Sequence, residues 1–204
     1  MKTKRPYTMG ARAEAVEETR LRIIRALVAL AGERPFAEIS LEDIAAGAGV
    51  SVQTVLRRFG SRDALFAVAM ETAMSEVEDE RRTPAGDASA AVRTVVEHYE
   101  RRGRAALLLL AQEGHDEVAR KATERGKAMH RGWVRDAFFP ATEDEAVLDL
   151  LVVATDVYTW KLLRLDRGHG RALTERRMRA LVDAVLASAP TPPEPTKIQL
   201  KGDQ

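Results

Sequence analysis

The 204-residue sequence contains no cysteine. It therefore excludes disulfides, cysteine-ligated zinc and a thiol nucleophile, and it suits the reducing cytoplasm, where we expect the protein to reside. Aromatic residues make up only 5% of the chain, so an aromatic-rich ligand pocket is not indicated. The most apolar runs, residues 105–111 and 146–165, are too short or too interrupted by charge to span a bilayer. Residues 1–10 carry Lys and Arg without a following apolar stretch, so we expect no signal peptide.

Common enzyme and metal motifs are also missing. The sequence has no Gly-x-Ser-x-Gly, no glycine-rich phosphate loop after a strand and no His-Glu-x-x-His. His115-Asp116-Glu117 begins like the last of these but lacks the second histidine. The four histidines have no close ligand spacing. We therefore expect neither catalytic residues nor a metal site nor a cofactor.

The formal net charge of +1 is unevenly distributed. Up to Arg62 there are 11 Lys and Arg against 7 Asp and Glu, whereas the rest holds 21 against 24. A basic N-terminal part on a mildly acidic body is expected if only one end of the molecule meets phosphate. Ordinary surface charge could produce so small a difference, so this observation only supports a nucleic-acid function.

Apolar residues recur with helical spacing throughout, and no run alternates like a strand, which predicts an all-α fold. The patterns predict helices over residues 14–31, 62–82, 88–101, 104–113, 116–139, 143–165 and 175–187, besides two short ones described next. Gly103 is expected to separate two of these helices.

Residues 40–66 predict two short helices joined by a sharp turn and followed by a third. Ser40 and Asp43 form a capping box at the first helix, which Gly49 can end in a left-handed conformation. Ser51 caps the second helix, and Gly60 ends it. This arrangement is a helix-turn-helix.

The second short helix has two faces. Val52, Val55, Leu56 and Phe59 form an apolar stripe, and Gln53, Thr54, Arg57 and Arg58 lie opposite. Arg can bind guanine and Gln adenine in the DNA major groove, while Thr can contact a thymine methyl or a phosphate. The alternative is an ordinary surface helix, because polar outer faces are common.

The stretch resembles the DNA-binding domain of the tetracycline-repressor (TetR) family of bacterial transcriptional regulators. The matching residues are Ile44-Ala45, Ala48-Gly49-Val50-Ser51, Thr54-Val55-Leu56-Arg57-Arg58-Phe59 and Ser61-Arg62-Asp63-Ala64-Leu65-Phe66. The match covers about the first third of the chain. It implies a three-helix DNA-binding domain followed by a helical ligand-binding and dimerisation domain.

Two departures affect the expected DNA contacts. The family usually has a phosphate-binding tyrosine where Leu56 stands, and leucine cannot make that bond. Arg58 and Arg62 replace a common histidine and lysine, and Arg58 can offset the lost contact. The candidate DNA-binding residues are Ser40, Ser51, Gln53, Thr54, Arg57, Arg58 and Arg62, with Lys4 and Arg5 in a basic arm that reaches a minor groove or merely aids solubility.

The expected domains are residues 1–62 for DNA binding, 63–187 for ligand binding and dimerisation, and a flexible tail over 188–204, which contains four prolines. Met178, Leu181, Val182 and Val185 form an apolar stripe on the last helix, and the helix before it is apolar around much of its circumference. The resemblance implies that these two helices pair with their copies in a four-helix interface. A monomeric helical core is the alternative.

The resemblance also implies a pocket for a small molecule in the helical body. Candidate walls are His98, Tyr99, Gln112, Met129, Trp133, Phe138, Asp156 and Trp160, although the aromatic ones could equally be core residues. Asp156 lies in an apolar run and could face a cationic ligand, pair with an arginine or face water.

Together these patterns favour a repressor that binds a palindromic operator as a dimer and is released by a small molecule. The same residues would also fit an activator or a ligand-independent regulator. The alternative from another class is a helical small-molecule carrier or protein-interaction module whose helix-turn-helix does not bind DNA.

Overall fold

The computed structural model describes residues 7–189, with side-chain environments from residue 13 onward. This part is helical and contains no strand, which confirms the all-α prediction. The helices are α1 Tyr7–Ala31, α2 Leu41–Ala48, α3 Val52–Phe59, α4 Arg62–Glu80, α5 Ala88–Leu110, α6 Glu117–Ala137, α7 Glu145–Thr155, α8 Val157–Lys161 and α9 Arg171–Ser188. Short turns η1 (Phe36–Glu38), η2 (Ala141–Glu143) and the π-helical η3 (Leu162–Asp166) join some of them. Lys4, Arg5 and residues 190–204 lie outside the described part.

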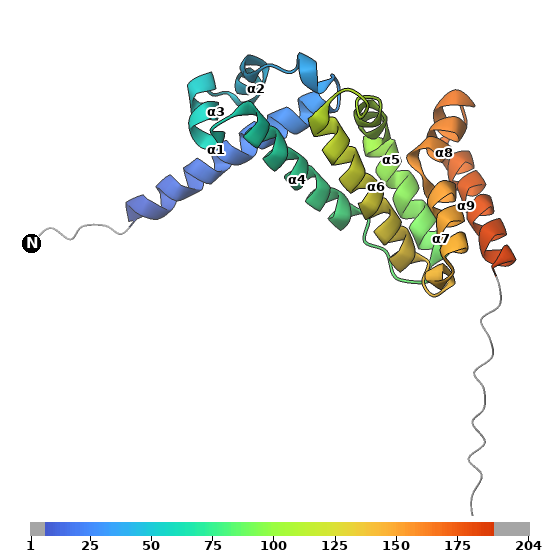
Figure 1. Cartoon of the computed structure of the whole chain (residues 1–204). Coiled ribbons are helices and arrows are strands. Elements are labelled where there is room, and N and C mark those ends of the chain that lie inside the picture. The colour runs from blue at the N-terminus through green and yellow to red at the C-terminus, as the bar shows by residue number, and fades with distance from the viewer. Residues whose placement is uncertain (1–6, 190–204) are drawn as a thin grey trace, which may run out of the picture.

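The helices form two groups, with α1–α4 at one end of the molecule and α5–α9 at the other (Figure 1). The first group has its own core, in which the Phe36 and Phe66 rings meet edge to face with centroids 5.2 Å apart. Burying such side chains removes apolar surface from water and is the main force that holds α1–α4 together. The fully buried members include Ile23, Ile24, Leu27, Ile44, Val55 and Leu65.

The predicted caps around α2 and α3 are confirmed. Ser40 and Asp43 each accept from the other's backbone N–H at 3.0 Å, which completes the capping box. Gly49 adopts the left-handed conformation with φ 65°, which a side chain would disfavour. Ser51 accepts from the backbone of Thr54 at 3.2 Å. These local bonds fix where α3 begins and how it is aimed.

Helix α4 belongs to both groups. Its N-terminal residues Leu65, Phe66 and Ala69 are buried in the first core, and its C-terminal half packs beside the body. Ala119 of α6 reaches back into the first core. A rigid helix with core contacts at one end and body contacts at the other ties the two groups together mechanically.

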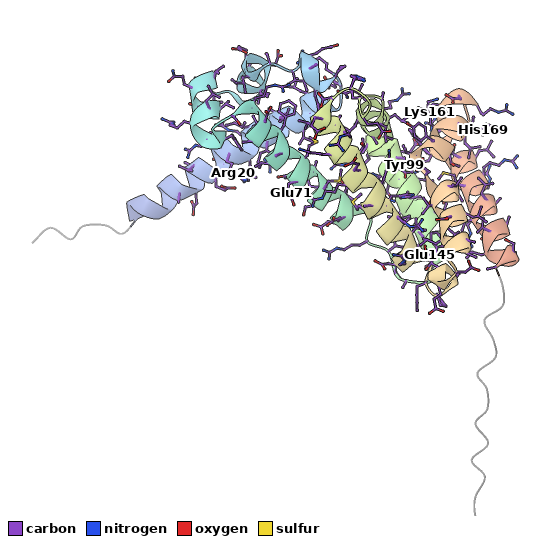
Figure 2. The ribbon with its side chains drawn as sticks, in the orientation of Figure 1. Arg20, Glu71, Tyr99, Glu145, Lys161 and His169 are labelled. Atoms are coloured by element: carbon purple, nitrogen blue, oxygen red, sulfur yellow. The ribbon has the colours of Figure 1, made fainter. Side chains whose placement is uncertain are left out.

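The body has a second core built from α5, α6, α7, α8 and α9. Tyr99, which lies among these helices in Figure 2, donates its hydroxyl to the Thr155 carbonyl at 3.1 Å. Leu148, Leu151 and Met178 are completely buried around it. The hydrogen bond matters because a buried hydroxyl group without a partner would destabilise the core.

The expected break at Gly103 is wrong, because α5 runs continuously from Ala88 to Leu110. A Cβ at position 103 would lie 2.6 Å from the Trp160 ring, closer than atoms can pack. The glycine therefore makes room for a tryptophan from α8 instead of ending a helix. Trp160 also donates its indole N–H to Glu100 at 3.0 Å.

The expected continuous helix over residues 143–165 is also wrong. The backbone of Asp156 is extended, with ψ 153°, and separates α7 from α8. Its carboxylate accepts from the backbone N–H of Tyr158 at 2.8 Å and caps α8. A short acidic side chain that bonds to nearby backbone competes with helix continuation. The last helix begins earlier than predicted, at Arg171.

Replacing Gly103 with alanine should destabilise the protein by about 1–3 kcal/mol, because the added methyl group forces Trp160 out of its site. Gly132 on α6 is the matched control, since a Cβ there meets nothing within 4 Å. Gly132→Ala should leave stability unchanged or raise it by up to about 1 kcal/mol through helix propensity. Denaturant unfolding of both variants measures the difference. Equal stabilities would show that the α5–α8 contact adapts without cost.

No helix in residues 7–189 is long and apolar enough to cross a membrane.

Candidate nucleic-acid interface and ligand cavity

Helix α3 presents an exposed polar face. The side chains of Gln53, Arg57 and Arg58 are exposed and make no hydrogen bond or ion pair with another described residue. Val55 is completely buried behind them and anchors the helix to the first core. Leu56 departs from the expected apolar stripe, because it is 39% exposed. The face is therefore free to contact an external partner.

The hydroxyl groups beside this face are partly engaged in local structure. Ser51 and Thr54 share a hydrogen bond of 3.0 Å between their hydroxyls. Ser40 donates to the Asp43 carboxylate at 2.7 Å while capping α2. Ser40 and Ser51 remain exposed, so capping and an outside contact are compatible.

Arg62 is placed differently from the other expected DNA-binding residues. Its guanidinium donates to the carbonyls of Phe36 and Ile39 and lies 4.2 Å above the Phe66 ring. These contacts satisfy the end of η1 and hold it against α4. The described contacts of Arg62 are thus within the protein, where they hold the segment that leads into α2 against the start of α4.

A cavity of about 310 Å³ lies between the two groups of helices. Its wall comes from the end of α1, one face of α4, and parts of α5 and α6, with α7 and α8 closing one end. The volume is at the lower end of the range of small-molecule sites. Apolar side chains from α1, α4 and α5 make up much of the wall, including Val28, Met70, Met74, Val77 and Leu109.

The structure brings four of the eight candidate ligand residues to this cavity, namely His98, Tyr99, Met129 and Asp156. The others lie outside its lining. Gln112 accepts from the Phe36 backbone at 2.7 Å and donates to the Leu108 carbonyl, so it connects α5 to η1. Phe138 and Trp160 are core residues, and Trp133 packs behind the polar end.

Arg81 is the main charged residue at the polar end, although no sequence pattern singles it out. It is only 4% exposed and follows directly on α4. Its guanidinium lies 4.3 Å above the Trp133 ring, and Nη2 is 2.6 Å from His130 Nδ1. Arginine stays protonated in proteins, so His130 Nδ1 must be the acceptor. His130 Nε2 then carries the proton and faces the Val152 carbonyl at 3.4 Å.

A second charged group, Glu80, contacts two residues of the cavity wall. Glu80 accepts two hydrogen bonds from Arg102 Nε at 3.2 Å and lies 3.3 Å from His98. The bonds from Arg102 lower the pKa of Glu80 to about 2. Burial, reinforced by the charge of Arg81, lowers the pKa of His98 to about 4. The same causes lower the pKa of His130 to about 3. Both histidines are therefore neutral at pH 7.

The protein should lose stability between pH 6.5 and pH 4. The unfolded chain takes up protons on His98 and His130 near pH 6.5, whereas the folded protein does so only near pH 4 and 3. The free energy of unfolding should therefore fall by about 4 kcal/mol from pH 7 to pH 5. Denaturant unfolding at the two pH values measures this change.

Two comparisons isolate the histidines. The pKa of Glu80 is also lowered in the folded protein, but its protonation reduces the free energy of unfolding only below its ordinary pKa of 4.5. Asp156 acts in the opposite direction, since burial raises its pKa. His130→Gln should remove about half of the pH dependence, and the exposed His115→Gln should leave it intact. Equal stability of the parent protein at pH 7 and pH 5 would contradict the assignment.

An exposed apolar face lies on α7–α9, at the end of the molecule away from α1–α3 (Figure 1). Val153 is 64% exposed and Leu150 52% exposed, both on α7. Tyr158 on α8, Leu162 on η3 and Leu181 on α9 are also exposed, and Tyr158 lines the cavity as well. Of the predicted α9 stripe, Met178 and Val182 instead face the body core. Large apolar side chains exposed on neighbouring helices make this region a candidate interaction surface.

No group of three or more potential metal ligands gathers in the described residues.

Residues 23–69 match the family model described as bacterial regulatory proteins, tetR family. A comparison with curated proteins gave no match. The matched segment spans the end of α1, α2, α3 and the start of α4, and it ends at Ala69, the last α4 residue buried in the first core.

Several solved structures share the fold. A transcriptional regulator from Rhodococcus sp. Rha1 is 19% identical with a TM-score of 0.65, covering 85% of this chain and 99% of its own. A tetR-family regulator from Streptomyces coelicolor is 22% identical with a TM-score of 0.63, covering 85% and 90%. The multidrug binding protein EbrR, solved with imidazole, is 20% identical with a TM-score of 0.58, covering 86% and 92%. The likeness extends over both helix groups.

Proposed function

Because residues 23–69 form a helix-turn-helix domain of the tetR family of bacterial regulatory proteins, we propose that this DNA-binding regulator is a repressor that binds a palindromic operator as a homodimer and is released by a small molecule. The observation that carries the proposal is the exposed polar face of α3. Gln53, Arg57 and Arg58 have no internal partner in the described residues. Exposed Arg and Gln on a short braced helix suit base edges and phosphates in a major groove.

The apolar face of α7–α9 supports the dimer. A two-fold axis through this face would place the same residues of each copy against one another. It would also set two α3 helices at a fixed separation, as half-sites on a palindrome require. The exposed apolar residues Leu150, Val153 and Leu181 would then be removed from water, which is a driving force for association.

The cavity supports the release by a small molecule. It is lined by α1 and α4 of the first group as well as by the body, so a bound molecule contacts both. A ligand that fits one arrangement of the two groups better than another shifts DNA affinity by its differential binding energy, about 1–3 kcal/mol in typical cases. EbrR, which shares the fold, was solved with imidazole bound.

A salt-titrated DNA-binding experiment tests the proposal. The full chain is titrated against the region upstream of its own gene and against random DNA of equal length. Specific binding to a palindrome, with an affinity that falls steeply as salt rises, supports the proposal. Affinity no greater than for random DNA would overturn it. That result would favour the alternative of a helical carrier whose helix-turn-helix does not bind DNA.

A further inference from the structure

The cavity is elongated along α4. Met70, Met74, Val77 and Arg81 line it and recur every three or four residues, so they lie on one face of the helix. The distance along α4 from Met70 to Arg81 is about 16 Å at the usual helical rise. The cavity therefore has two distinct ends, one near the DNA-binding helices and one at Arg81.

The end near the DNA-binding helices is apolar. Val28 and Ala31 of α1, Met70 of α4, Leu109 of α5 and Ala122 of α6 contribute to its wall. None of these side chains can bind a charge or donate a hydrogen bond. This end suits a hydrocarbon chain or ring.

The Arg81 end holds a buried positive charge without a carboxylate partner. Arg81 forms no ion pair in the described residues, and its Nε has no hydrogen-bond partner. The other two cations of the wall are already neutralised. Arg102 pairs with Glu76 at 3.0 Å and Glu80 at 2.7 Å, and Lys127 pairs with Glu113 at 2.6 Å. A buried, incompletely bonded guanidinium is costly unless an anion completes it.

We propose that the cavity binds an elongated apolar molecule with one carboxylate group, and that Arg81 binds the carboxylate. The inference rests on the proposed function, because it names the chemical class of the effector. The planar guanidinium is suited to a carboxylate, which can bond two of its nitrogens together. The apolar part of the ligand then lies along α4 toward Met70.

The neighbouring titratable groups agree with an anion at this end. His98 and His130 are neutral near pH 7, so neither supplies a competing charge. Asp156 is the acidic residue of the wall, but one of its oxygens caps α8 through Tyr158. Burial raises the pKa of Asp156, and the backbone N–H of Tyr158 and the charge of Arg81 act against that rise. A cationic ligand would instead have to sit beside Arg81.

Four probe molecules test this inference on the full chain. Decanoate, decan-1-ol and decylammonium share a ten-carbon chain and differ in charge, and acetate carries the head group alone. Calorimetric titration below the micellar concentration should give decanoate an affinity about 10- to 100-fold higher than decanol. Acetate should show no measurable binding, because it lacks the apolar part. Equal affinity for decanoate and decanol, tighter binding of decylammonium, or no binding of decanoate would each overturn the inference.

Two variants locate the ligand. Arg81→Gln should reduce the decanoate affinity to that of decanol and leave decanol binding unchanged. Ala73→Phe, which fills the wall beside Met74, should weaken both probes alike. Unchanged decanoate binding in Arg81→Gln would overturn the assignment of the head group. Retained decanol binding shows that Arg81→Gln is folded, and the probe series on the unsubstituted chain decides the question if it is not.

DNA binding is measured separately, so that the two proposals can fail independently. Decanoate binding by a chain that does not recognise its upstream palindrome would uphold the carboxylate site and overturn the regulatory function. Palindrome binding by a chain that binds none of the ten-carbon probes would uphold DNA binding and overturn the carboxylate site. Release of the palindrome by decanoate, lost in Arg81→Gln, would support both.

Discussion

Replacing Val153 with glutamate should convert the proposed dimer into a monomer and abolish high-affinity operator binding. Val153 is 64% exposed in the single chain, the largest exposed fraction among the large apolar side chains of the described part. A two-fold interface buries the substitution twice, and each buried carboxylate lacks a partner. We expect a cost of about 3 kcal/mol or more, which is at least about 100-fold in the dimer dissociation constant. Sedimentation velocity and an operator titration measure the two consequences.

The matched control places the same charge elsewhere. Ser75 is exposed on α4, far along the chain from α7–α9, and Ser75→Glu should leave the dimer intact. A Val153→Glu protein that sediments as a dimer would show that the apolar face of α7–α9 is not the interface. If the unsubstituted chain is itself a monomer, the alternative of a monomeric helical core is correct.

Replacing Arg57 with alanine should weaken operator binding by about 1–3 kcal/mol at each half-site, or about 2–6 kcal/mol for the dimer. Arg57 and Gln53 lie one turn apart on the exposed face of α3, where both can reach base edges. The loss should be accompanied by relaxed base preference at the position that each one reads. Selection from a randomised site library, performed on both single variants, measures the preference.

Arg58→Ala provides the contrast on the same helix. If Arg58 binds phosphate, its loss should weaken binding to all DNA sequences alike and reduce the salt dependence by about one contact per half-site. Base preference should stay as in the parent protein. An unchanged site profile for Arg57→Ala and Gln53→Ala would remove both residues from base readout, and unchanged affinity for Arg58→Ala would remove the phosphate contact.

The sequence predicted the helix-turn-helix well because its signals are local. The cap at Ser40 depends on Asp43, three residues away, and the turn depends on Gly49 alone. A pattern within one helical turn can be read without knowing the rest of the fold. The exposed face of α3 follows in the same way from the spacing of Gln53 and Arg57.

The cavity could not be predicted equally well, because its character depends on distant contacts. Arg81 stands beside Arg82 at the end of a helix, and nothing in that pair indicates that only Arg81 is buried. Its burial comes from Trp133 and His130, about fifty residues later in the chain. The expected helix break at Gly103 is wrong for the same reason, since the ring that requires a glycine there belongs to the distant Trp160.

The length of α4 has a consequence for the sensitivity of the protein. Its 19 residues, Arg62–Glu80, extend about 28 Å. Gly60 and Ser61 connect its start to α3, and Arg81 at the cavity follows its end. A tilt of about 5° around the Arg81 end would displace the other end by about 2.5 Å, on that length. If the two copies moved in opposite directions, the distance between their α3 helices would change by about 5 Å, which is more than the rise of one base pair. In the proposed dimer, a small tilt of α4 at the cavity would thus be enough to put the two α3 helices out of step with the helical repeat of DNA.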